Sequence, residues 1–164
     1  MTAQIADRIL IEGQEFGLFS EPLNEYLTRA NISFTAPNTA LWRGYIARWE
    51  VADSQLFLLG VWGQACTVQV DEAAPTAECH RKHGGQCVVR GLDLRDLFPG
   101  SNGRVFADWV SGRLRIPQGK LLEYVHMGFE SIYQRYLLLD VDHGVVKNTT
   151  IAETPQSKWW TFWK

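Results

Sequence analysis

The sequence has no long hydrophobic run, little cysteine and almost no net charge, and each absence excludes a class of protein. No segment of the 164-residue chain approaches the about 20 consecutive apolar residues of a membrane-spanning helix. A formal charge of −2 gives no general attraction to nucleic acid. We therefore expect neither a membrane nor a nucleic-acid partner. Hydrophobic residues make up 46% of the chain, which excludes disorder and predicts a single globular domain over residues 1–164.

Cysteine usage indicates a reducing compartment. The three cysteines, Cys66, Cys79 and Cys87, are an odd number, so they cannot all pair within one chain. The first ten residues have no signal-peptide core. We therefore expect a cytoplasmic protein without a disulfide framework.

Two of these cysteines lie in a segment with spaced metal-ligand residues, Cys79-His80-x-x-His83-x-x-x-Cys87. Thiolate and imidazole are the ligands that zinc prefers, and close spacing lets one loop hold an ion. The spacing matches no common zinc module, however. We predict no metal and no cofactor, and Cys79, His83 and Cys87 are the candidate ligands should zinc be bound.

Alternation of apolar and polar residues with a period of two dominates the chain and predicts β-strands joined by tight turns. Strands are predicted at residues 8–11, 15–19, 41–51, 55–62, 105–116, 120–127, 132–141 and 145–151. The run at 55–62 is almost unbroken in its apolar character, which is typical of a strand covered on both faces. With its neighbour at 41–51 it is expected to form the centre of an antiparallel sheet. Turns are predicted at Glu12-Gly13-Gln14, Pro117-Gln118-Gly119 and Asp142-His143-Gly144.

Two short helices complete the predicted fold, one capped by Ser20 and the other by Asp93. Residues 63–90 interrupt the strand pattern, and we expect a long loop or a peripheral hairpin there. The fold class is therefore predicted as mainly β (α+β), an antiparallel curled sheet or a barrel-like sandwich with two short helices.

The sequence indicates no reaction. Phosphate-loop, dinucleotide-binding and nucleophile-elbow motifs are absent. His126 and Glu123 are the candidates for moving a proton, although His126 can equally be a hydrogen-bonded core histidine. On one strand their side chains point to opposite faces, so they can share a pocket only if a bulge intervenes. The catalytic residues, and whether the chain is an enzyme, stay unknown at this stage.

Arginines alternate with aromatic residues on the predicted strands. Such a pattern can bind an anionic or planar ligand through bidentate hydrogen bonds and stacking. The candidate ligand-binding residues are Arg43, Tyr45, Arg113, Arg115 and Tyr124. The alternative is a solvated sheet face on which Arg113 and Arg115 pair with carboxylates such as Glu123.

The C-terminal tail, residues 157–164, is unusually aromatic. Its large side chains are Trp159, Trp160, Phe162 and Trp163. Each can bury about 150–250 Å², and four of them in water would exceed the apolar patch that most soluble monomers tolerate. We expect one side of the tail to pack on its own sheet and the other to contact a second chain, either a protein partner or a copy of itself.

Several sequence blocks resemble an uncharacterised family of small bacterial hypothetical proteins. The blocks are Arg8-Ile9-Leu10-Ile11-Glu12-Gly13, Leu41-Trp42-Arg43-Gly44-Tyr45, Val105-Phe106-Ala107-Asp108-Trp109, Leu114-Arg115-Ile116-Pro117-Gln118-Gly119 and Glu123-Tyr124-Val125-His126-Met127-Gly128. The resemblance covers most of the chain except residues 63–90 and the tail. It implies a bacterial cytoplasmic protein and supplies no activity, ligand or catalytic residue.

These observations lead to two functional hypotheses. The first is a non-enzymatic protein-binding module, such as an immunity-type or toxin-neutralising protein, because catalytic motifs are missing and small stand-alone bacterial proteins often accompany toxin-linked genes. The second is a small-ligand enzyme or sensor that binds an anionic or planar ligand over the central strands.

Deletion of residues 158–164 tests the expected role of the tail. Burying even half of the aromatic area stabilises the protein by several kcal/mol at about 25 cal/mol per Å². The truncated chain should therefore melt at a lower temperature and self-associate less, as measured by thermal unfolding and light scattering. Unchanged stability together with an unchanged oligomeric state would contradict a docked tail.

Overall fold

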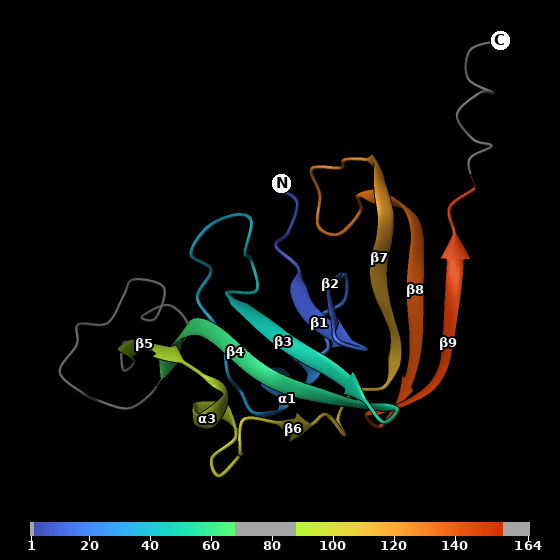
Figure 1. Ribbon diagram of the computed structural model, residues 1–164. Helices are drawn as coiled ribbons and strands as arrows, with labels where there is room; N and C mark the ends of the chain where they lie inside the picture. The colour runs from blue at the N-terminus through green and yellow to red at the C-terminus, as the bar shows by residue number, and fades with distance from the viewer. Residues whose placement is uncertain (1, 68–87, 156–164) are drawn as a thin grey trace.

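A curled β-sheet dominates the computed structural model, which describes residues 2–67 and 88–155 (Figure 1). The strands are β1 (Asp7–Ile11), β2 (Gln14–Leu18), β3 (Tyr45–Ala52), β4 (Gln55–Thr67), β5 (Val88–Leu92), β6 (Val105–Phe106), β7 (Gly112–Glu123), β8 (Ile132–Asp142) and β9 (Val145–Glu153). Two short helices, α1 (Asn24–Arg29) and α3 (Leu94–Leu97), accompany them. The strand order is β2-β1-β3-β4-β9-β8-β7, with β5 and β6 also paired to β4. The predicted mainly β curled sheet with two short helices is confirmed.

The sheet is mixed, because β1 and β3 run parallel. Their register extends from Arg8 opposite Arg48 to Ile11 opposite Val51. A parallel pair needs a long crossover, which here contains β2 and α1. The sequence pattern predicted a mainly antiparallel sheet and gave no sign that β1 and β3 run parallel.

Two long hairpins of the curled sheet touch at their turns. Gln55 of β4 pairs with Val145 of β9, and Leu56 N donates to Gly144 O at 2.7 Å. Beyond this junction the β3–β4 and β8–β9 hairpins diverge (Figure 1). On the other side of the sheet, Phe19 N donates to Arg115 O at 2.8 Å, which brings the end of β2 against β7.

The core fills the inner face of this curl. Tyr45, Ala47 and Trp49 of β3 are buried, as the period of two predicts. An aromatic cluster formed by Trp49, Trp109, Tyr26 and Phe98 links β3 to α1. The prediction that residues 55–62 are covered on both faces is wrong at Trp62, whose side chain is 55% exposed.

The predicted turn at residues 117–119 is wrong, because β7 runs straight through it. Pro117 pairs with Tyr136 of β8, and the ladder becomes irregular only after Gln118, near Gly119 with φ +76°. The N–H and C=O groups of Arg115 point away from β8, toward Ser20 and Phe19. By alternation the nitrogen of Pro117 also points away from β8, so proline costs the ladder no hydrogen bond.

One of the two predicted helix caps is present in the structure and the other is not. Asp93 caps α3 in a capping box, as expected. The predicted Ser20 cap is wrong: α1 begins at Asn24 without a side-chain cap, and Ser20 Oγ instead accepts a hydrogen bond from Arg115 N at 3.0 Å. A hydrogen bond between the segment that follows β2 and strand β7 therefore takes the place of a local cap.

Within the predicted excursion at 63–90, β4 continues to Thr67 and pairs antiparallel with β5. Residues 68–87 lie outside the part that the structure describes. In the described part, no helix has the length and apolar character needed to cross a membrane.

Gly44 is a position where the fold requires glycine, and Gly13 provides a matched control. Both have φ +78°, but a Cβ at Gly44 would lie 2.8 Å from backbone atoms of Phe34 and Thr35, whereas at Gly13 it would meet nothing. We expect Gly13→Ala to cost about 1–2 kcal/mol of backbone strain, and Gly44→Ala roughly 2–5 kcal/mol once the contact is added. Urea unfolding measures both values, and equal losses would contradict the close approach.

Candidate binding pocket

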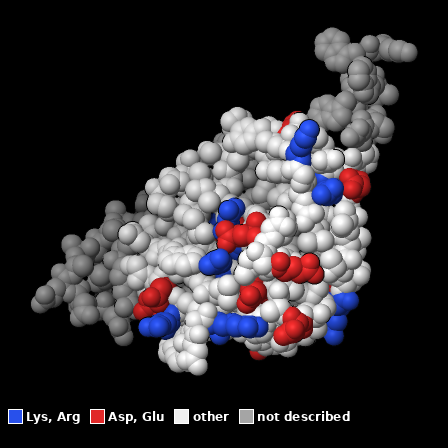
Figure 2. Space-filling view, in the orientation of Figure 1, with Lys and Arg blue, Asp and Glu red and all other residues white. Residues whose placement is uncertain are grey.

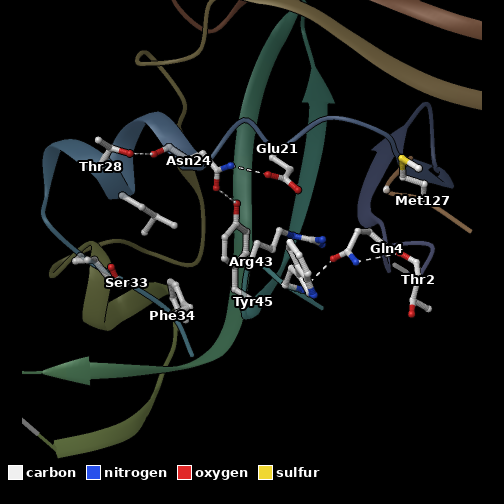
Figure 3. Close-up of a pocket in the computed structure, with 14 residues that line it drawn as sticks. Thr2, Gln4, Glu21, Asn24, Thr28, Ser33, Phe34, Arg43, Tyr45 and Met127 are labelled. Atoms are coloured by element: carbon white, nitrogen blue, oxygen red, sulfur yellow. Dashed lines mark hydrogen bonds between the residues drawn. The ribbon is translucent and has the colours of Figure 1, made fainter. Parts of the chain in front are cut away.

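A pocket of about 590 Å³ lies beside α1 (Figure 3). The N-terminal segment, α1 with the residues before it, the turn that leads into β3, and the loop after β7 form its walls. Its polar and aromatic lining includes Gln4, Glu21, Asn24, Trp42, Arg43 and Tyr45. On the face of the molecule in Figure 2, acidic and basic side chains are intermixed.

Gly44 allows a turn that places the side chains on either side of it around the pocket. Its N–H donates to Leu41 O at 3.0 Å, which closes a turn directly before β3. Positive φ lets the chain make this turn while Phe34 packs against the backbone. Trp42 and Arg43 precede the glycine and Tyr45 follows it, and all three line the pocket.

Arg43 forms a buried ion pair with Asp7. Arg43 Nη2 lies 2.6 Å from Asp7 Oδ1, and the two side chains are 5% and 0% exposed. Asp7 also accepts hydrogen bonds from Ala47 N at 2.9 Å and from Trp49 Nε1 at 3.2 Å. Burial raises the pKa of the Asp7 carboxyl, while the Arg43 guanidinium and these donors act in the opposite direction. By this contact the Nη2 group of Arg43 is occupied by Asp7 inside the protein.

A chain of hydrogen bonds connects the core to Glu21. The Tyr45 hydroxyl donates to Asn24 Oδ1 at 2.8 Å, and Asn24 Nδ2 donates to Glu21 Oε2 at 2.6 Å (Figure 3). Burial raises the pKa of the Tyr45 phenol, and the negative charges of Asp7 and Glu21 raise it further. Tyr45 thus stays protonated and acts as the donor that orients this chain.

The structure brings two of the five predicted ligand-binding residues together, Arg43 and Tyr45. Arg113 instead pairs with Asp140, at 2.7 Å, on the exposed side of β7 and β8. This hydrogen-bonded contact raises the pKa of Arg113 and lowers that of Asp140. The partner of Arg113 is therefore Asp140 rather than the Glu123 considered from sequence.

Two further predicted ligand-binding residues, Arg115 and Tyr124, lie outside this pocket. Arg115 Nη2 donates to Phe129 O at 2.8 Å, and its guanidinium lies over the rings of Phe19 and Tyr136. Tyr124 is 53% exposed and contacts His126 edge to face, with ring centroids 4.6 Å apart. Neither of them lines the pocket.

Of the remaining predicted residues, the structure describes Glu123 and His126, and neither is among the described residues that line this pocket. Glu123 and His126 are exposed, at the end of β7 and in the loop after it. The zinc candidates Cys79, His83 and Cys87 lie outside the described residues. So do the tail residues Trp159, Trp160, Phe162 and Trp163. Within residues 2–67 and 88–155, which the structure describes, no group of three or more His, Cys, Asp or Glu side chains could hold a metal ion.

Sequence analysis missed Glu21, Asn24 and Trp42. Glu21 and Asn24 stand in a polar segment that was interpreted only as the start of a helix. Trp42 stood in one of the quoted sequence blocks and within the strand predicted from alternation at residues 41–51. The turn at Gly44 ends that alternation, so the glycine was the available signal.

No family model, no curated protein and no solved structure matches the chain. The chemistry of the pocket itself therefore carries the functional argument.

Asp7→Asn tests the buried ion pair. The amide leaves the buried Arg43 charge without a counterion, so we expect a loss of about 3–5 kcal/mol in the free energy of unfolding. Glu15→Gln is the control, because Glu15 pairs with Arg8 and Arg48 at the surface and its loss should cost less than about 1 kcal/mol. Denaturant titration measures both, and similar small losses would show that the pair does not support the fold.

Proposed function

We propose that the chain is a non-enzymatic protein-binding module and that its binding surface is the pocket with the apolar side chains around it. The observation that carries this proposal is the exposure of Trp42, 62%, on the wall of a preformed pocket. Met127, 41% exposed, also lines it. Tryptophan and methionine are enriched at protein interfaces, and tryptophan often contributes most of the binding energy.

The lining favours binding over catalysis. No histidine, cysteine or lysine is among the described residues that form the pocket walls. The hydroxyl of Thr28 donates to Asn24 O, so it is engaged within α1. Nucleophilic catalysis requires a nucleophile beside a base that is itself oriented by a third group, and the pocket offers no such set.

The biological setting belongs to the same proposal. We place the module in the bacterial cytoplasm, where an immunity-type or toxin-neutralising role would require a protein partner. The aromatic tail is a second expected contact, either with this partner or with another copy of the chain.

A small-ligand sensor is the second candidate function. The pocket volume of about 590 Å³ supports it, since small-molecule sites typically measure about 300–1,000 Å³. The two candidates differ in what the purified protein should retain: a polypeptide or a small molecule.

The variants Trp42→Ala and Trp62→Ala distinguish the protein-binding module from the small-ligand sensor. Both side chains are large and exposed, but Trp62 lies on β4 and does not line the pocket. Tagged wild-type chain and Trp62→Ala should capture the same protein from a lysate of the source cells, and Trp42→Ala should lose it. With that protein purified, calorimetry should give a loss of about 2 kcal/mol for Trp42→Ala, as for a central interface tryptophan.

Two results would contradict the proposal. The first is that no captured protein depends on Trp42. The second is that a small molecule, identified by mass spectrometry, is retained in a Trp42-dependent way instead, which would favour the sensor.

A further inference from the structure

The charge of the pocket is set by Glu21. Of the residues that line it, Glu21 and Arg43 carry a charge. The guanidinium of Arg43 is directed to Asp7 through Nη2 and to Ile5 O through Nη1, at 2.6 and 2.7 Å. Its Nε is buried without an acceptor. An anion in the pocket would thus meet a neutralised and enclosed arginine, whereas a cation would meet the carboxylate of Glu21.

The carboxylate of Glu21 is held in place before any ligand arrives. A carboxylate can only accept hydrogen bonds, so the amide nitrogen of Asn24 must face it and the amide oxygen must face the Tyr45 hydroxyl. Tyr45 is 1% exposed and fixed in the core. Among the described residues no donor reaches Glu21 Oε1, so this oxygen can accept a hydrogen bond from a ligand.

Trp42 adds an aromatic surface suited to the same ligand. Its backbone N–H is held by Gln4 Oε1 at 2.8 Å, while its ring is largely exposed. The ring of Tyr45 is already covered by the Arg43 guanidinium, 5.2 Å from its centroid. Cations stack favourably on tryptophan, and arginine does so most often.

Resting on the proposed function, we infer that the pocket receives the cationic side chain of an arginine or lysine from the protein partner. Glu21 pairs with the cationic group and the ring of Trp42 contacts it. A pocket of about 590 Å³ has room for the whole side chain. The partner surface is therefore one from which a basic side chain projects.

The test uses NMR titration of the 15N-labelled full chain with Nα-acetyl-arginine methylamide. Nα-acetyl-citrulline methylamide is the matched probe, because it has nearly the same shape without the charge. We expect saturable shifts of pocket signals with the arginine probe and at least about tenfold weaker binding of the citrulline probe. Glu21→Gln should remove this preference while its amide oxygen still accepts from Asn24. Glu153→Gln, an exposed carboxylate on β9, should leave the preference unchanged.

The outcomes distinguish this inference from the proposed function. Equal binding of both probes, or a preference that survives Glu21→Gln, would overturn the cation site and leave the pocket as a binding surface. Binding of neither probe, with protein capture still dependent on Trp42, would overturn the inference alone. Selective arginine binding without any Trp42-dependent capture would support the cation site and contradict the protein-binding module.

Discussion

The buried ion pair between Asp7 and Arg43 is the interaction on which this arrangement depends. Asp7 lies on β1, and its carboxylate binds the turn before β3 and two groups of β3, Ala47 N and Trp49 Nε1. Parallel strands cannot be set in register by a tight turn, so a long-range contact must align them. Because an isolated buried charge is very unfavourable, Asp7 restricts the sheet to the register that brings Arg43 to it. A register that separated the two side chains would leave one charge buried without its partner.

The same pair also affects the charge that the pocket presents. From sequence, Arg43 and Tyr45 were predicted to hold an anionic or planar ligand, and both do line the pocket. Burial of Arg43 against Asp7 removes its charge from the lining, and the hydroxyl of Tyr45 is used to orient Asn24. The charge left facing the pocket is that of Glu21. Arg43 and Tyr45 were predicted to bind an anionic or planar ligand themselves. In the structure Tyr45 instead orients Asn24 beside Glu21, whose charge is negative.

The features that sequence predicts correctly are local ones. The β1–β2 and β8–β9 hairpins follow from turn residues at positive φ, Gly13 and His143-Gly144, and the Asp93 cap lies within one turn of its partners. The failures involve distant partners. Ser20 was expected to bond within its own helix but bonds across the sheet to Arg115, and nothing in the alternation of β1 or β3 indicates that they run parallel. Glu21 and Asn24 were not predicted for the same reason. Their hydrogen-bonded chain forms only when the fold places Tyr45 beside α1.

Gln4 joins three walls of the pocket through hydrogen bonds. Its backbone N–H donates to Gly128 O at 2.9 Å, its Oε1 accepts from Trp42 N at 2.8 Å, and its Nε2 donates to Thr39 O at 2.8 Å. One residue thus joins the loop after β7, the turn before β3 and the N-terminal segment, which form three of the walls. Arg115 also holds the loop after β7, because its Nη2 donates to Phe129 O. Walls that are tied together in advance lose little conformational entropy on binding, so more of the contact energy of an inserted side chain becomes affinity.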